Sequence, residues 1–396
     1  MGEKTKKPQI RFAGFTDDWE QRKLSDIVDV LDGDRGKNYP KETDFDTNGH
    51  TLFLNASNVT TDGFSFDTNQ FISEEKSDSM GNGKLIDDDI VITSRGSLGH
   101  IAWYSADIQR IVPYVRINSG MLILRKKVSI NTSYLYQFMK SDKGQNQISF
   151  MSFGSAQPQL TKKGIEGLNV NYPKKSKEQA KIGEYFSNLD NLITLHQRKL
   201  DKLKSVKKSM LEKMIPQNGE VKPEIRFTGF TDDWEQRKLG DVVDVRSGRD
   251  YKHLEEGDIP VYGTGGYMLS INEALSDDED AIGIGRKGTI DNPYILRAPF
   301  WTVDTLFYAV PRDKYDLNFV FDIFQNVNWK AKDESTGIPS LSKATINAVE
   351  TLMPEYAEQK KIGEYFSNLE NLITLHQRKL EKLQNIKKAM LEKMFV

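Results

Sequence analysis

Apolar side chains recur at alternating steps of four and three residues in two long segments, one ending near residue 214 and one near residue 394. This heptad spacing predicts a helix with one face packed against another helix. No glycine or proline follows Gly183 before Pro216, and none follows Gly363, so we expect two helices of about 33 residues. The predicted seam consists of Ile182, Phe186, Leu189, Ile193, His196, Leu200, Leu203, Met210, Ile362, Phe366, Leu369, Ile373, His376, Leu380, Leu383 and Met390.

A single amphipathic helix of this length needs a partner for its apolar face. We expect the two helices to pair with each other as an antiparallel coiled coil; the alternative is that each packs only on its own domain. The seam histidines are expected to be packed or hydrogen-bonded, and no metal site is predicted, because no cysteine or acidic cluster accompanies them. The lysine-rich far face is either solvated or a surface for a partner.

The segments before the helices alternate between short strand patterns and turn clusters, which predicts mixed α/β domains. The predicted strands are 51–57, 89–94, 100–104 and 120–126 in the first segment, and 259–263, 280–285 and 300–310 in the second. A helix is expected from Ser133 to Lys140, and its counterpart near Asn318 to Asn326.

The chain is an internal duplication. Residues 8–30 and 223–245 share 19 of 23 positions, and residues 178–214 and 358–394 share 30 of 37. The inserts between these segments, about 31–177 and 246–357, share little sequence. We therefore expect a pseudo-two-fold α/β (α+β) fold with domains at 1–177 and 223–357, a central helix and linker at 178–222, and a C-terminal helix at 358–396.

Composition narrows the class of protein. The chain has 396 residues, no cysteine and a net charge of −2. Disulfides and thiol chemistry are excluded, no transmembrane helix or signal peptide is apparent, and a cytoplasmic location is expected. The helices are basic and the rest of the chain is acidic, so any nucleic-acid surface on the inserts must be local.

Two basic, glycine-containing turns follow predicted strands, at Ser94–Gly99 and Gly285–Ile290, and each insert later carries a P-x-L-[ST]-K sequence, at 158–162 and 339–343. Arg95 matches Arg286 in this comparison. Such turns let the backbone and a cation approach a phosphate or a guanine edge. Ordinary hairpin turns with surface charge remain the alternative.

Catalytic motifs are absent or incomplete. The G-x-G-x-x-G match at 283–288 is followed by a proline-containing turn instead of a helix, so it does not fit a dinucleotide site. Asp291–Tyr294 resembles the catalytic tetrapeptide of adenine methyltransferases, but its second proline is missing. No nucleotide-binding lysine loop or serine elbow occurs. We expect a chain that is not an enzyme by itself.

The order of these parts resembles the DNA-specificity subunits of type I restriction–modification enzymes. The resemblance rests on the W-E-Q-R-K-L segment, the variable insert and the E-Q-x-K-I-G-E-Y-F-S-N-L helix, followed by the whole set again. Ile259–Gly266, the arginine–glycine turns and the P-x-L-[ST]-K sequences also resemble that family.

The resemblance implies that each insert reads one half of a split DNA site and that the paired helices set the gap. It also implies partners: double-stranded DNA, two methyltransferase subunits, and restriction subunits in the full complex. S-adenosylmethionine, magnesium and ATP would then belong to the partners, with no cofactor on this chain. The competing hypothesis is a coiled-coil interaction scaffold with two ligand-binding modules and no role in DNA recognition.

Candidate DNA contacts follow from residue type and from placement in turns. In the first insert they are Arg35, Lys37, Asn38, Tyr39, Asn55, Ser57, Asn58, Arg95, Ser97, Ser155, Gln157, Gln159 and Lys162. In the second they are Arg246, Arg249, Tyr251, Lys252, Tyr262, Thr264, Arg286, Lys287, Thr336, Ser340 and Lys343.

Overall fold

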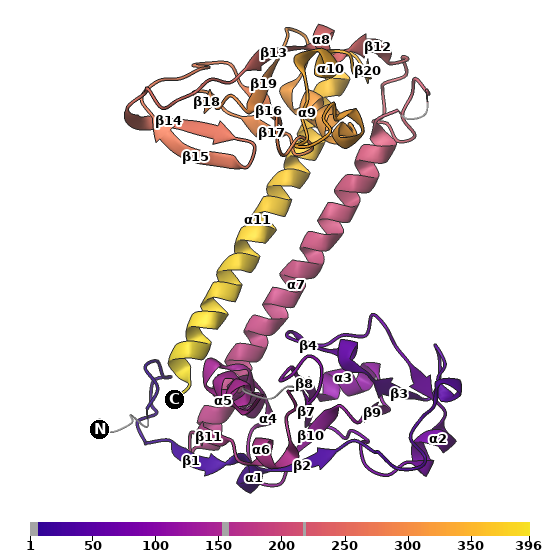
Figure 1. The fold of residues 1–396 in the computed structure, drawn as a ribbon, viewed down its shortest axis with the longest axis vertical. Helices are drawn as coiled ribbons and strands as arrows, with labels where there is room; N and C mark the ends of the chain where they lie inside the picture. The colour runs from indigo at the N-terminus through magenta and orange to yellow at the C-terminus, as the bar shows by residue number, and fades with distance from the viewer. Residues whose placement is uncertain (1–6, 153–157, 217–218) are drawn as a thin grey trace. The chain divides into compact units, whose positions relative to one another are not determined.

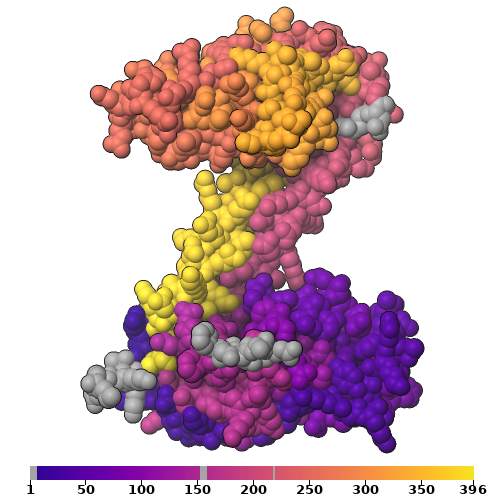
Figure 2. All heavy atoms as spheres, viewed as in Figure 1, coloured from indigo at the N-terminus to yellow at the C-terminus, as the bar shows by residue number. Residues whose placement is uncertain are grey.

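The computed structural model describes residues 7–152, 158–216 and 219–396. The chain divides into two compact units, Met1–Leu195 with Leu380–Val396, and His196–Lys379 (Figures 1 and 2). We call these the first and the second unit, and we call the variable insert of each unit its head. Within the described residues, no helix combines the length and apolar character that a membrane crossing requires.

The first unit contains short helices and strands besides its share of the long helices. Its strands are β1 (Glu20–Lys23), β2 (Val28–Asp32), β3 (Thr51–Leu54), β4 (Val59–Thr60), β5 (Gly63–Phe64), β6 (Phe71–Ile72), β7 (Asp89–Thr93), β8 (Ile101–Tyr104), β9 (Val115–Ile117), β10 (Met121–Lys126) and β11 (Asn169–Tyr172). Its short helices are α1 (Leu24–Ile27), α2 (Glu74–Ser79), α3 (Ala106–Ile111), α4 (Thr132–Lys140), α5 (Asp142–Ser152) and α6 (Lys162–Glu166).

An antiparallel sheet in the order β2–β10–β7–β8 forms the centre of the first unit. Strand β7 is buried along its whole length because both of its faces are covered. Ile90 and Ile92 pack in the cluster that contains Tyr134 and Phe138 of α4. Val91 points the other way, into the cluster formed with the β6–β3–β9 sheet. The continuous apolar run of β7 is what a strand between two layers requires.

The second unit repeats this plan. Its strands are β12 (Glu235–Lys238), β13 (Val243–Ser247), β14 (Glu256–Gly263), β15 (Gly266–Ile271), β16 (Ala281–Gly285), β17 (Tyr294–Leu296), β18 (Trp301–Thr302), β19 (Leu306–Pro311) and β20 (Glu350–Met353). Its short helices are α8 (Leu239–Val242), α9 (Leu317–Asn326) and α10 (Lys343–Asn347). The central sheet has the order β13–β19–β16–β17, and a second sheet has the order β15–β14–β18.

The predicted elements are found within a few residues of their expected bounds, with one exception. The segment 300–310, predicted as one strand, is two strands, β18 and β19, in different sheets. The chain turns between them, where Leu306 N donates to Val303 O at 2.9 Å. Asp304 and Thr305 are the only polar residues between Val303 and Leu306, and no glycine or proline marks this turn, so the sequence pattern shows little sign of the break.

The two long helices, α7 (Ser176–Met214) and α11 (Tyr356–Met394), have 39 residues each. The predicted length of about 33 residues was too short because both helices continue through their glycine. A Cβ at Gly183 would lie 2.8 Å from Ser133 Oγ, and a Cβ at Gly363 would lie 2.5 Å from Asp316 Oδ1. Each glycine therefore lets the long helix touch the first turn of α4 or α9.

Polar pairs join the long helices inside each unit. In the second unit, His196 Nδ1 lies 2.8 Å from His376 Nδ1, and Lys207 donates to Glu370 Oε2 at 2.5 Å. The residue numbers fall along α11 as they rise along α7, so the helices are antiparallel. In the first unit, Lys387 pairs with Asp190. Lys207 and Lys387 thus reach carboxylates on the opposite helix, and the predicted fold class with its antiparallel coiled coil is confirmed.

The repeated segments form the base of each unit. Strands β1 and β11 pair antiparallel in the first unit, as β12 and β20 do in the second. Arg11 donates to both oxygens of Glu178, at 2.6 and 2.8 Å, and Arg226 does the same to Glu358, at 2.7 Å for both bonds. The two carboxylates are almost fully buried. These ion pairs fasten the repeated segment to the start of its long helix.

Candidate nucleic-acid interface

The central sheets of the two heads share one hydrogen-bonding register. Val30 and Val245 occupy the same place in the repeated segment, and each pairs with the central strand, β10 or β19. That strand pairs in turn with β7 or β16. Counting along these ladders equates Thr93 with Gly285, the last residue of each strand. The basic turns therefore leave the same end of equivalent sheets.

The backbone of the basic turn is held in the same way in both heads. The amides of residues 94 and 95 donate to Gly120 O at 2.8 and 3.2 Å, and those of residues 286 and 287 donate to Thr305 O at 2.8 and 3.3 Å. Arg95 therefore corresponds to Lys287. The match of Arg95 with Arg286 was wrong by one residue. The sequence comparison paired the two arginines by residue type, whereas the strand register shows which backbone positions are equivalent.

The P-x-L-[ST]-K sequences lie beside these turns. Leu160 N donates to Ser94 O at 3.0 Å, and Leu341 N donates to Arg286 O at 2.9 Å. These bonds bring Gln159 next to Arg95 in the first head. In the second head, Ser340 and Lys287 form an isolated antiparallel β-bridge through their backbones. Thr161 and Ser342 then cap α6 and α10 with their side-chain oxygens. The two P-x-L-[ST]-K sequences thus have equivalent structures in the two heads.

Several first-head candidates meet around the loop 118–120. Arg35 donates to Ser119 O at 3.2 Å, and the Tyr39 hydroxyl accepts from Ser119 N at 3.4 Å. Arg95 reaches the same loop through its amide, as described above. Asn38 donates to Ser79 O at 2.6 Å on the neighbouring segment. Arg35 and Arg95 are exposed, so two cations extend from one end of the sheet.

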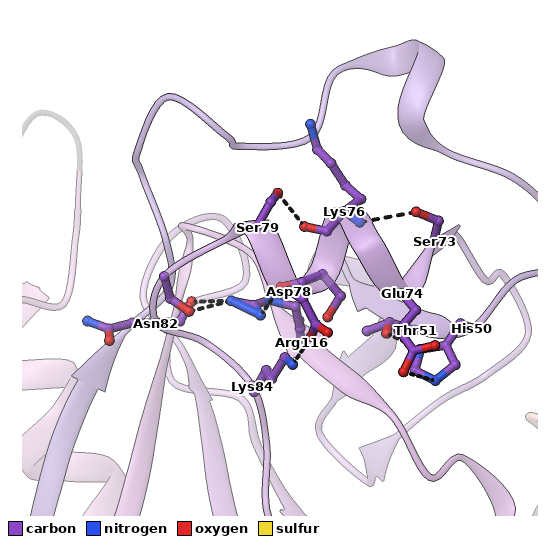
Figure 3. A network of polar contacts seen from close by, with 12 residues as sticks. His50, Thr51, Ser73, Glu74, Lys76, Asp78, Ser79, Asn82, Lys84 and Arg116 are labelled. Carbon is purple, nitrogen blue, oxygen red and sulfur yellow. Dashed lines mark hydrogen bonds and ion pairs between the residues drawn. The ribbon is translucent and has the colours of Figure 1, made fainter.

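A buried arginine organises the segment beside this loop, as Figure 3 shows. Arg116 donates to Ser77 O at 2.7 Å, to Gly81 O at 2.5 Å and to Asn82 O at 3.0 Å. The side chain is fully buried, and this burial lowers the pKa of its guanidinium. Asp34 accepts from Gly81 N at 3.1 Å, so the turn that carries Arg35 is tied to the same segment.

In the second head the equivalent end of the sheet is concave. A groove of about 1040 Å³ is lined by Arg286, Lys287, Thr336, Ser340 and Lys343, among other residues. The Arg286 guanidinium lies 5.8 Å from the centre of the Phe307 ring. Five candidates from the sequence are thus gathered around one cationic groove, although Asp304 and Glu334 also line it.

The hairpin β14–β15 contributes a neighbouring edge. A Cβ at Gly288 would lie 3.9 Å from Thr264 Oγ1, which places the hairpin turn against the basic turn. Tyr262 is half-buried and packs near Tyr294. Next to it, Tyr267 and Met268 are 63% and 49% exposed. These two apolar side chains were not among the candidates, since exposure of an apolar residue has no sequence signal.

Other candidates have structural roles or stand apart. Asn58 is fully buried and donates both amide hydrogens to Ser65 O and Thr68 O, so it has no donor left for DNA. Asn55 and Ser57 bond each other within that same turn. Ser155 and Gln157 lie outside the described residues. The remaining candidates, Lys37, Ser97, Lys162, Arg249 and Lys252, are exposed.

Arg246 is already paired with two carboxylates. Its guanidinium donates to Asp244 at 2.6 Å and to Glu279 at 2.5 Å, and these two carboxylates raise its pKa further above the usual range. Tyr251 is half-buried against the cluster around Val261. In the first head, Asp34 and Arg116 were not among the candidates, because the sequence does not distinguish a buried charged residue from one on the surface.

The comparisons with known proteins agree with this architecture. The family described as "Type I restriction modification DNA specificity domain" matches residues 16–205 and 231–385. The Type I restriction enzyme MjaVIII specificity subunit of Methanocaldococcus jannaschii is 22% identical, over 95% of this chain and 91% of that protein. The putative MjaX specificity subunit of the same organism is 23% identical, over 95% and 92%.

A solved structure shares the fold. The crystal structure of the type I restriction–modification S subunit from M. genitalium superposes with a TM-score of 0.75 at 15% identity, covering 98% of this chain and 99% of that one. The family match covers both copies of the internal repeat. The chain therefore belongs to the specificity subunits of type I restriction–modification systems.

Proposed function

We propose that this chain directs restriction and adenine methylation to an asymmetric DNA site in two parts, with each head reading one half-site. The equivalent basic turns carry this proposal. In both heads the same backbone presents cations at the same end of the sheet, yet the side chains differ, as Arg95 and Lys287 do. A common backbone with different side chains is what two readers of different sequences need.

The spacing between the half-sites is assigned to the long helices. The pair His196–His376 and the ion pair of Lys207 join α7 to α11 in the second unit, and the ion pair of Lys387 joins them in the first. These pairs fix the register of the helices in each unit. A helix pair with a fixed register has a fixed length, at about 1.5 Å per residue. The unread gap in the DNA site then follows from the number of residues in the helices.

The repeated frame is assigned to two copies of one methyltransferase subunit, with restriction subunits joining the full complex. The same two leucines are exposed in both copies of the long helix: Leu192 and Leu195 are 43% and 46% exposed, and Leu372 and Leu375 are 45% and 46% exposed. Exposed apolar side chains at matching places suit two equivalent docking surfaces. S-adenosylmethionine, magnesium and ATP would be bound by those partners, and this chain would supply no catalytic group.

Selection from random duplex DNA tests the reading function. The chain with its methyltransferase partner should enrich a motif in two parts. Arg95→Ala should relax one half of the motif, and Arg286→Ala with Lys287→Ala should relax only the other half. Arg110→Ala, an exposed change on α3, is the matched control and should leave the motif unchanged. Equal losses in both halves would contradict the assignment of one head to each half-site, and no enriched motif would favour the interaction scaffold.

Docking is tested separately by native mass spectrometry of the assembled complex. Leu192→Glu with Leu195→Glu should remove one methyltransferase copy, and Leu372→Glu with Leu375→Glu should remove one as well. Thr194→Glu, also exposed on α7, should retain both copies. Full assembly of both leucine variants would show that the partners dock elsewhere.

A further inference from the structure

The basic turns of the two heads carry different side chains at two neighbouring positions, 95 with 159 and 287 with 340. Residue 95 corresponds to residue 287, and residue 159 corresponds to residue 340, through the shared backbone bonds of both turns. The pair is Arg95 with Gln159 in the first head and Lys287 with Ser340 in the second. Since the backbone is the same, the side chains alone distinguish the two surfaces at this place.

Gln159 occupies one edge of the Arg95 guanidinium. With the amide turned so that its oxygen faces the arginine, Gln159 Oε1 accepts from Nε at 3.2 Å and from Nη2 at 3.3 Å. This orientation satisfies both groups, whereas the reverse one brings two donors together. The opposite edge, made by Nη1 and the second hydrogen of Nη2, points away from the amide.

The free edge of Arg95 is not paired with a carboxylate of the described residues. Within residues 7–152, 158–216 and 219–396, no carboxylate forms an ion pair with Arg95, whereas Arg246 is held by two and Arg35 lies 3.8 Å from Asp32. Arg95 is also exposed. A guanidinium that is fixed along one edge and open along the other is arranged for a second planar acceptor pair.

We propose that residues 95 and 159 form a specificity-determining pair, in which Gln159 orients Arg95 to read one guanine of the first half-site. The inference rests on the proposed DNA-reading function. Guanine O6 and N7 form the acceptor pair in the major groove that matches two parallel N–H donors. Lys287 is a point charge without such a fork, so the same place in the second head discriminates less between bases.

The experiment compares guanine with 7-deazaguanine, which lacks N7, at each guanine of the selected motif. For the assembled methyltransferase complex we expect one position in one half-site where this change weakens binding about 10-fold or more. At that position Arg95→Ala should bind both duplexes equally. If every penalty survives in Arg95→Ala while the complex remains sequence-specific, this inference fails and the proposed function stands. If the complex has no sequence preference, the proposed function itself fails.

Gln159 is tested as a positioning residue. Gln159→Ala should keep the melting temperature of the chain but lose most of the discrimination between guanine and 7-deazaguanine at the same position. Gln159→Glu should restore it, because a carboxylate accepts from the same guanidinium edge. Ser340→Ala in the second head is the matched control and should leave the first half-site unchanged. Discrimination that is unaffected by Gln159→Ala would overturn the orienting role.

Discussion

His196 and His376 face each other across α7 and α11, with their Nδ1 atoms 2.8 Å apart and their ring centres 5.0 Å apart. One Nδ1 must donate and the other must accept, so the bond exists only while at least one ring is neutral. Burial, followed by the charges of His376, Lys379 and Lys199, lowers the pKa of His196. The helix pair of the second unit therefore carries a group that resists protonation.

We expect the stability of the second unit to fall as the pH drops below about 6.5. A histidine with a lowered pKa in the folded state binds fewer protons there than in the unfolded state, so acid favours unfolding through that window. Thermal melts between about pH 7.5 and about pH 5.5 measure this. The double variant His196→Gln, His376→Gln should show a shallower decline over the same range; an unchanged decline would assign the effect to other groups.

Close helix contact makes a second prediction. A Cβ on Gly363 would lie 2.5 Å from Asp316 Oδ1 and 2.7 Å from Phe319 N, in the capped first turn of α9. In Gly363→Ala, overpacking should cost about 1–3 kcal/mol. The roughly 1 kcal/mol by which alanine ordinarily favours a helix offsets part of this cost, so the free energy of unfolding should fall by up to about 2 kcal/mol.

Urea unfolding measures this effect. Gly265→Ala is a suitable control because a Cβ added at Gly265 would meet no neighbouring atom within 4 Å, and the stability of this variant should be nearly unchanged. Gly363→Ala as stable as the parent chain would mean that α9 can move away from the long helix at little cost.

The sequence predicted the long helices well because the heptad pattern depends on local spacing alone. It could not predict that Gly183 and Gly363 lie inside the helices, since that depends on how closely α4 and α9 approach. The same limit applies to the basic turns. Comparison of the two turn sequences matched Arg95 with Arg286. The strand register that equates Arg95 with Lys287 depends on pairing between segments that are distant in the sequence. Candidate positions were visible as polar turns, while the buried state of Asn58 and the ion pairs of Arg246 required the fold.

Helix α9 of the second unit carries a buried carboxyl that forms no ion pair among the described residues. Asp322 on α9 is 2% exposed, and its Oδ2 has no hydrogen-bond partner among the described residues. Burial raises its pKa well above the usual value; nearby Lys207 opposes this shift, and Glu370 adds to it. Such a carboxyl binds more protons in the folded state, so it weakens folding increasingly as the pH rises above about 4.

Asp322→Asn should therefore raise the free energy of unfolding by about 1–2 kcal/mol near neutral pH, and by less in acid. The matched change lies in the first unit. Gln137 stands six residues after the cap of α4, as Asp322 does after the cap of α9, and it donates to Asp190 at 2.8 Å. Gln137→Glu should destabilise the chain, and more so near neutral pH than in acid, because it introduces a buried carboxyl at the matching place. Melts as a function of pH measure both; a less stable Asp322→Asn chain would show that the carboxylate has a partner in solution.

The length of the helix pair makes the last prediction, which concerns the gap in the DNA site. Seven residues added after both His196 and His376 keep the heptad seam continuous and lengthen each helix by about 10.5 Å. This equals about three base pairs of B-DNA at 3.4 Å each. The selected motif should keep both half-sites and gain about three unread base pairs. Affinity should fall, because three base pairs also rotate one half-site by about 100° around the DNA axis. Seven residues added to α7 alone break the pairing of the helices and should abolish the motif, whereas an unchanged gap in the double insertion would show that the helices do not set the spacing.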